Sequence, residues 1–217
     1  DKYIKRRLKK LLKIKIPEKT SPLLCQFLGY ILGDGNPTKK DRTKTHVYVR
    51  ATDKNINNLY LYGKIGENLF NVKFNVRVRS NINVNSRNRL NFSSHILTKF
   101  IDSISKDVLN NNPYRKIPKL IHKVSNKEIS YFFRGLFDAE GCVKHHSIVL
   151  TSSSWDIIVV SQMLLSRLGI YSHIYDALAK YNKKSNRDAY QLAISEPKSI
   201  KIFYKKIGFE DQNKSKR

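Results

Sequence analysis

Two acidic residues, Asp34 and Glu140, occupy the same place in two matching passages of the sequence. The passages read FLGYILGDG (residues 27–35) and FRGLFDAEG (residues 133–141), and each is an apolar run with glycine third, a small residue seventh, an acid eighth and glycine last. Such a run predicts a helix that ends at the acid. The last turn of a helix carries partial negative charge, so an acid there is disfavoured, and two such acids brought side by side also repel each other. The repeated pattern therefore indicates a bound cation.

A divalent metal ion fits this arrangement. The expected ligands are the carboxylates of Asp34 and Glu140, together with carbonyl oxygens at the helix ends, such as those of Gly33 and Ala139. Oxygen ligands suit Mg²⁺, and we expect Mn²⁺ to substitute for it. Ions at such a site can activate water and stabilise a leaving oxygen, which favours phosphodiester hydrolysis. The alternative is that both passages are helix ends kept for packing alone.

Small residues on both predicted helices show how the two acids could meet. Gly29 and Gly33 are four residues apart, as are Gly135 and Ala139, so each pair lies on one helix face. Bare backbone at such positions lets two helices approach closely. We therefore expect a helix interface at these four residues, with the two acidic ends side by side.

The remaining chain repeats in two halves. Each half reads helix, two strands separated by a helix, a further strand and a closing helix, and one more strand could follow the motif. This predicts an α+β fold of two pseudo-twofold-related repeats, αββαββα-like, with antiparallel sheets, packed through the two motif helices. The strands are expected at residues 46–52, 72–80, 88–93, 144–152, 170–177 and 189–195, with His145 and His146 together on one strand. We expect a basic segment at 1–21, half-domains at 22–109 and 128–217, and a linker at 110–127.

The net charge points to a polyanionic partner. Lys and Arg number 42 against 17 Asp and Glu, which gives a formal charge of +25, while 40% hydrophobic residues suffice for a folded core. Nucleic acid is the commonest partner of such a surface. No apolar run has the length of a membrane span, so we expect a soluble, intracellular protein with no membrane contact. The basic amphipathic segment before Pro17 is expected on the core or on DNA backbone, with a membrane surface as the alternative.

Strand alternation separates an apolar face from a face able to bind nucleic acid. In residues 72–80, Phe74, Val76 and Val78 alternate with basic and amide side chains. Arg and Asn can read guanine and adenine edges in the major groove, whereas loop lysines contact phosphates. The expected DNA-binding residues are Lys39, Lys40, Lys44, His46, Tyr48, Arg50, Lys73, Asn75, Arg77, Arg79, Arg87, Arg89, Asn91, Lys144, His146, Tyr171, His173, Tyr175, Lys183, Lys184 and Gln191.

With these motifs in place, the chain resembles the monomeric, two-motif LAGLIDADG homing endonucleases over nearly its whole length. In that family the motif helices form the interface of two half-domains, the sheets form a DNA-binding saddle, and the acid at motif position eight binds the catalytic metal, which implies this role for Asp34 and Glu140. Family members also carry a basic residue near the scissile phosphates of each half. The best matches here are Lys116 and Lys214, with Lys119 and Lys216 as close rivals.

The resemblance implies a site-specific double-strand DNA endonuclease. Such an enzyme is a monomer that hydrolyses a long asymmetric target with Mg²⁺ and so promotes mobility of its host intron, in the cytoplasm of an archaeon or in an organelle. Two alternatives stay open: an RNA maturase that assists intron splicing, with intron RNA as its partner, and a DNA-binding regulator that does not cut.

Overall fold

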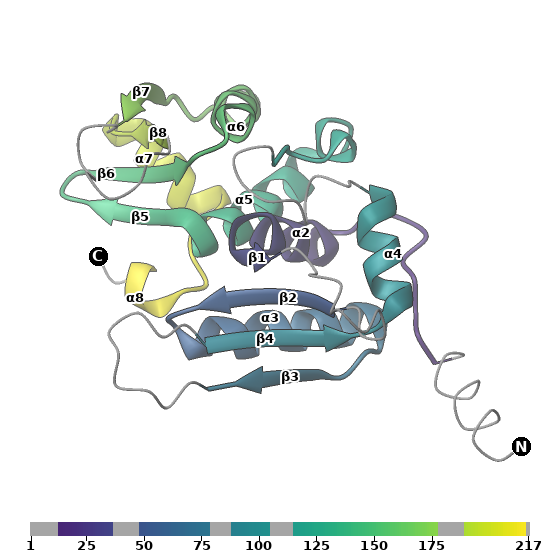
Figure 1. The fold of residues 1–217 in the computed structure, drawn as a ribbon. Coiled ribbons are helices and arrows are strands. Elements are labelled where there is room, and N and C mark those ends of the chain that lie inside the picture. The colour runs from purple at the N-terminus through teal and green to yellow at the C-terminus, as the bar shows by residue number, and fades with distance from the viewer. Residues whose placement is uncertain (1–12, 37–47, 79–87, 105–114, 178–188, 216–217) are drawn as a thin grey trace, which may run out of the picture.

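The structure is a computed structural model that describes residues 13–36, 48–78, 88–104, 115–177 and 189–215 (Figure 1). Within these ranges, no helix has both the length and the apolar character needed to cross a membrane. Most of the basic N-terminal segment and several expected DNA-binding residues lie outside the described ranges, namely Lys39, Lys40, Lys44, His46, Arg79, Arg87, Lys183 and Lys184.

The two halves have the same order of elements. The first half comprises α2 (Pro22–Asp34), β1 (Gly35–Asn36), β2 (Tyr48–Asp53), α3 (Ile56–Phe70), β3 (Phe74–Arg77), β4 (Asn88–Ser93) and α4 (His95–Ile104). After the short η1 (Lys119–His122), the second half comprises α5 (Asn126–Glu140), β5 (Gly141–Lys144), β6 (Ser147–Ser152), α6 (Trp155–Arg167), β7 (His173–Ala177), β8 (Ala189–Ile194), α7 (Pro197–Lys206) and α8 (Gln212–Ser215).

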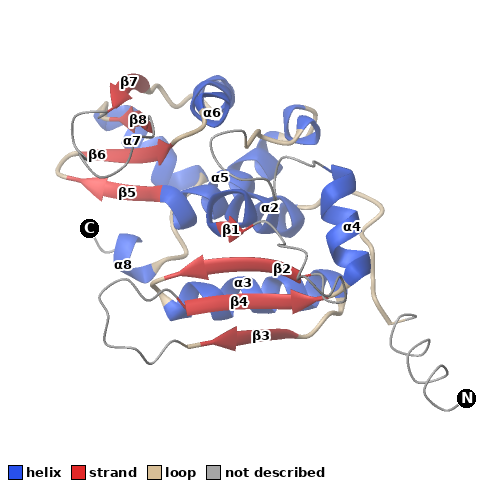
Figure 2. Cartoon of the chain, in the orientation of Figure 1, coloured by secondary structure: helices blue, strands red, loops and turns tan. Residues whose placement is uncertain are grey.

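Each half builds one antiparallel four-stranded sheet. The strand orders, β1-β2-β4-β3 and β5-β6-β8-β7, correspond strand by strand. Figure 2 shows α2 and α5 at the centre of the molecule between the two sheets, with α3 covering the back of the first sheet. The predicted α+β class, with two related repeats packed through the motif helices, is confirmed.

The motif helices begin at side-chain caps. Ser21 accepts a hydrogen bond from the Leu24 amide and is followed by Pro22 at the first helical position. Ser125 and Glu128 form a reciprocal capping box at the start of α5. Both helices are almost wholly buried along their apolar faces, and Phe27 packs edge-on against Phe70 and Phe92 of the first half. These caps fix where each helix begins, and the buried contacts hold the helix in place up to the acid that ends it.

The expected strand over residues 144–152 was wrong at its start. His145 and His146 form the turn of a hairpin in which Lys144 pairs with Ser147, and β5 precedes the turn. His145 has φ 48°, the left-handed conformation that such tight turns require. Neither residue is the glycine or asparagine that usually indicates this turn, so the sequence concealed it.

Candidate metal centre and nucleic-acid interface

The acids Asp34 and Glu140 end α2 and α5, and both side chains are half-buried. The helices cross where their small residues meet: a Cβ added at Gly29 would overlap the carbonyl oxygen of Phe132, and one at Gly135 would overlap that of Gln26. Near the helix ends, a Cβ at Gly33 would overlap the Cβ of Ala139 and would lie 3.0 Å from the Cγ of Glu140. The Glu140 side chain therefore lies beside the end of the other motif helix.

Arg115 is a buried basic residue at the end of α2 that was not expected from the sequence. Its side chain is 6% exposed, and Nη1 donates to the carbonyl oxygens of Leu32 and Gly33, each at 2.6 Å, while Nη2 donates to that of Gly35. Burial lowers the pKa of Arg115, and the nearby carboxylates of Glu140 and Asp34 oppose that shift. The guanidinium thus binds the end of α2 within the field of both motif acids.

The expected catalytic lysines have different surroundings. Lys116 and its rival Lys119 are exposed. Lys214 of α8 is half-buried, and its Nζ donates to the carbonyl oxygens of Phe137 at 3.1 Å and Asp138 at 2.5 Å. The rival Lys216 lies outside the described residues. Each motif helix therefore ends against one cation, Arg115 on α2 and Lys214 on α5.

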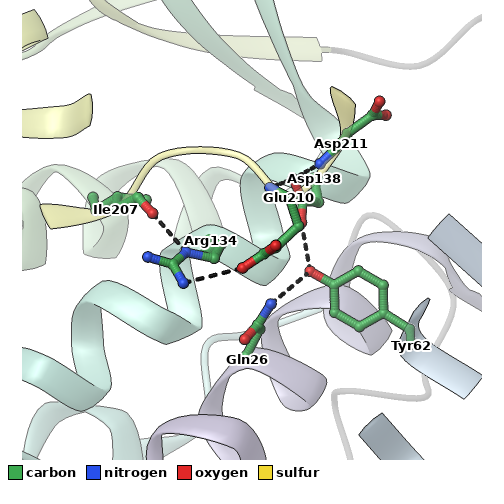
Figure 3. Close-up of polar contacts among 7 residues, drawn as sticks. All are labelled: Gln26, Tyr62, Arg134, Asp138, Ile207, Glu210 and Asp211. Carbon is green, nitrogen blue, oxygen red and sulfur yellow. Dashed lines mark hydrogen bonds and ion pairs between the residues drawn. The ribbon is translucent and has the colours of Figure 1, made fainter. Parts of the chain in front are cut away.

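A buried carboxyl group joins the two halves close to this site (Figure 3). Asp138, 1% exposed, accepts a hydrogen bond at 2.6 Å from the hydroxyl of Tyr62 on α3, and that hydroxyl accepts one from Gln26 on α2. The backbone amides of Glu210 and Asp211 also donate to Asp138. Through these bonds, the segment that carries Lys214 is fixed to both motif helices.

Asp211 completes the attachment of that segment. It is 4% exposed, and its carboxylate accepts hydrogen bonds from the side-chain amides of Asn55 and Asn58, each at 3.0 Å. Asn58 also donates to Asp53, which accepts from the hydroxyl of Tyr30. The C-terminal residues of the second half therefore pack on polar groups of the first.

Asp138 should make folding stability depend on pH. Burial, partly opposed by its hydrogen bonds, raises the pKa of Asp138 from 3.8 to about 6. Because this raised value means that the folded protein binds the proton more tightly than the unfolded chain, the contribution of Asp138 to stability is largest below pH 4 and falls as the pH rises to about 6. Two pKa units correspond to roughly 3 kcal/mol.

Asp138→Asn, which resembles the protonated acid, should therefore gain stability relative to wild type as the pH rises from 4 to 6.5. Denaturant unfolding of both proteins across this range would measure the difference. A constant difference between the two would contradict a raised pKa for Asp138.

The polar face of the first sheet gathers basic and amide side chains. Arg50, Asn91 and Asn75 are direct neighbours across β2, β4 and β3. Arg50 donates from Nε to Asn91 Oδ1 at 2.8 Å. A hollow of about 350 Å³ on this face contains no acidic residue and is lined by Tyr48, Arg50, Lys73, Phe74, Asn75, Arg77, Arg89, Asn91 and Ser93. The structure thus brings the described candidates of the first half together.

The second sheet presents a different polar face. Tyr175 pairs with Gln191, and Gln191 donates to Thr151 at 3.3 Å. Tyr171 and Tyr175 are 57% and 52% exposed, and His173 lies between them. Two further candidates, Lys144 and His146, are exposed at the β5–β6 turn rather than on this face. Arginine is absent from the described part of this sheet, so the two faces would contact DNA unequally.

The residues present fit a hard divalent cation. Among the described residues there is no cluster of three or more His, Cys, Asp or Glu. A site at the helix ends would therefore use two carboxylates and backbone carbonyls, with water or substrate phosphate as the remaining ligands, which is how Mg²⁺ is commonly held. Cys25 is not suited to thiol chemistry, since burial raises its pKa to about 12 and keeps its thiol protonated.

Residues 127–208 match a protein-family model described as a LAGLIDADG-like domain. The second half of the chain is therefore similar to this domain family. The LAGLIDADG motif FRGLFDAEG lies within the matched region, which confirms the resemblance seen in the sequence.

Solved structures extend the LAGLIDADG likeness to both halves. The homing endonuclease I-DmoI in complex with DNA and Ca has a TM-score of 0.65 at 19% identity, covering 85% of this chain and 88% of that one. Its complex with DNA and Mn gives 0.63 at 21%, covering 86% and 96%. Full-length DUF199/WhiA from Thermatoga maritima gives 0.58 at 14%, covering 91% and 59%. At these identities the likeness establishes a shared two-motif LAGLIDADG fold.

This chain matches only a part of several longer curated relatives. The chain is 26% identical to glutamine–fructose-6-phosphate aminotransferase of Methanocaldococcus jannaschii, over 94% of this chain but 18% of that protein. It is also 26% identical to the replication factor C small subunit of the same organism, over 89% of this chain and 10% of that protein. An uncharacterized protein of that organism, MJ0398, matches at 26% over 91% of this chain and 70% of its own length. The chain thus spans less than a fifth of the first two relatives.

Proposed function

We propose that the protein is a site-specific double-strand DNA endonuclease that depends on Mg²⁺ and promotes mobility of the element that encodes it, which we expect to be an intron. The observation that carries the proposal is the meeting of two acids, Asp34 and Glu140, at the ends of two helices that cross on bare backbone. A fold shared with a DNA-bound homing endonuclease supports it.

The relatives support an activity that is separate from the activities of the longer proteins in which matching regions occur. An aminotransferase and a replication factor have unrelated names, yet both match this chain over a small part of their length. A module found in such different proteins is expected to act by itself. Their archaeal source agrees with the cytoplasm of an archaeon as one of the two expected settings.

In this proposal the chain binds duplex DNA as a monomer. Arg77, Arg89 and Asn91, which line the hollow on the first sheet, would contact base edges and phosphates. Asp34 and Glu140 would hold the metal, which when bound would supply activation of water and stabilisation of the leaving oxygen. Lys214, fixed by its bonds at the end of α5, supplies positive charge beside the scissile phosphate. Lys116, which is exposed, would act at the other strand only if DNA binding draws it in.

The test uses DNA that joins the host sequences on either side of the element. Purified protein is incubated with this DNA and Mg²⁺, with Ca²⁺ as the control expected to allow binding without cutting. Discrete cleavage of both strands at the junction is the expected result. Binding without cleavage at every temperature would overturn the proposal and favour the regulator, and specific binding of the intron RNA instead would favour the maturase.

A DNA-binding role without cleavage is the second candidate. The likeness to DUF199/WhiA, at a TM-score of 0.58, shows that this fold is not restricted to proteins named as endonucleases. The presence of an acid at position eight of both motifs favours cleavage.

Arg77→Ala should lower the affinity for DNA and should make that affinity less dependent on salt. Arg77 is exposed on the basic face of the first sheet, so its loss should lower affinity about tenfold or more and should make the slope of log K against log salt shallower by about 1 if it contacts phosphate. Fluorescence anisotropy at several salt concentrations measures both quantities.

Lys64→Ala is the matched control for charge. Lys64 is exposed on α3, which covers the opposite face of the same sheet (Figure 1). Equal losses of affinity for the two variants would show that net charge, and not this face, binds the DNA.

A further inference from the structure

The proposed function gives no role to Arg115, although its buried guanidinium is bonded to a carbonyl group that was expected to bind the metal. The Gly33 carbonyl, expected to bind the metal, accepts a hydrogen bond from Arg115 Nη1 at 2.6 Å. The same nitrogen donates to Leu32, and Nη2 donates to Gly35. Three carbonyl groups at one helix end thus surround the cation, much as they would surround a bound metal ion.

Hydrogen bonds to the second half of the molecule hold Arg115 in this position. Its own carbonyl oxygen accepts a hydrogen bond at 2.6 Å from Ser154, which caps α6, and the Ile117 amide donates to Asp156 in the first turn of α6. The side chain then reaches across to α2 of the first half. The Arg115 segment therefore bonds to both halves, through its backbone to α6 and through the guanidinium to α2.

The charges explain what the guanidinium does there. Two carboxylates at two helix ends add negative charge to ends that are already partly negative. Burying a guanidinium is costly unless opposite charge surrounds it, and Asp34 and Glu140 are the charges that oppose the lowering of its pKa. The acids and the cation therefore compensate one another without any metal.

We propose that Arg115 is the resident counter-ion of the Asp34–Glu140 pair. The guanidinium donates hydrogen bonds to the carbonyl groups at the end of α2, including that of Gly33. Its positive charge compensates the charges of Asp34 and Glu140 while no divalent ion is bound. Gly33 is then a ligand of the guanidinium, and a divalent ion would be held by Asp34 and Glu140 with oxygen ligands other than the Gly33 carbonyl. The inference concerns the same acids as the proposed function but does not depend on DNA cleavage.

The experiment tests whether a divalent ion can replace the positive charge of Arg115. Arg115→Gln removes the charge and keeps an amide donor, whereas Arg115→Lys keeps the charge. Thermal unfolding of both variants and of wild type is measured in EDTA and in Ca²⁺. We expect Ca²⁺ to raise the Tm of Arg115→Gln by at least about 4 °C more than that of wild type, since the ion replaces the missing charge. Arg115→Lys should respond like wild type.

A second comparison requires no metal. In EDTA, Asp34→Asn should raise the Tm when combined with Arg115→Gln, because it relieves uncompensated repulsion, and should not raise it beside the native arginine. A Ca²⁺ response equal in all three proteins, together with additive effects of the two substitutions, would reduce Arg115 to a helix cap and overturn the inference.

Failure to fold is also informative. Recovery of folding of Arg115→Gln by Ca²⁺ or by Asp34→Asn would support the counter-ion role, and recovery by neither would contradict it. The DNA cleavage assay on wild type decides the proposed function independently of these results.

Discussion

Asp34→Asn and Glu140→Gln should each abolish DNA cleavage while leaving DNA binding intact. Each substitution replaces a charged oxygen ligand by a neutral amide of the same shape at the end of a motif helix. Loss of several kcal/mol of metal-dependent stabilisation of the transition state corresponds to a decrease in rate of about 1000-fold or more. Binding should persist because the sheet faces proposed to contact DNA are unchanged.

Single-turnover cleavage and binding in Ca²⁺ measure the two properties separately. Glu18→Gln, at an exposed acid before α2, is the matched control and should cut like wild type. Cleavage within tenfold of wild type in either motif variant would exclude that carboxylate as a metal ligand. Loss of binding together with cleavage would indicate that the variant had lost its fold.

The repeated motif could be predicted from sequence because its information is local. Glycine spacing on a helix, the acid at the eighth position and alternation in β3 all involve residues within a few positions of one another. The structure places Phe74 and Val76 partly buried and Asn75 and Arg77 exposed, as alternation predicts. Val78, which was expected on the apolar face, is 61% exposed, because the strand ends at Arg77. These features needed no knowledge of which segments meet in space.

The cations at the helix ends could not be located in the same way. Arg115 contacts α2 about 80 residues earlier in the chain, and which of two adjacent basic residues points inward is decided by the anchors on α6. Lys116, one residue away, is the residue expected from the sequence, and it is exposed. Lys214, the expected residue of the second half, lies at the end of α5, and its partners there are equally remote in sequence.

The buried network around Asp138 was also missed. Asp138 stands at position six of the second motif, and nothing nearby in sequence reveals its partners. Its hydrogen bonds come from Tyr62 and from the amides of Glu210 and Asp211, more than 70 residues away in either direction. Such a contact follows from the packing of the two halves and is invisible before that packing is known.

The helix crossing itself is the feature on which the whole arrangement depends, and Gly135→Ala should destabilise it strongly. In an unobstructed helix, alanine is more favourable than glycine by about 0.5–1 kcal/mol. Here the new Cβ would overlap the carbonyl oxygen of Gln26 and lie 2.8 Å from the Tyr30 amide nitrogen, and backbone cannot move aside as a side chain can. The helices must separate, and we expect a loss of roughly 3 kcal/mol or more.

Gly169→Ala provides the control, because Gly169 has φ 78° but open space around its Cα. Its cost should be only the backbone strain of about 1–2 kcal/mol. Denaturant unfolding compares the two variants with wild type. Because separating the helices also separates Asp34 from Glu140, Gly135→Ala should lose cleavage even at temperatures where it stays folded, whereas Gly169→Ala should keep it. An unchanged or increased stability of Gly135→Ala would show that the helices do not cross as closely as the structure has them.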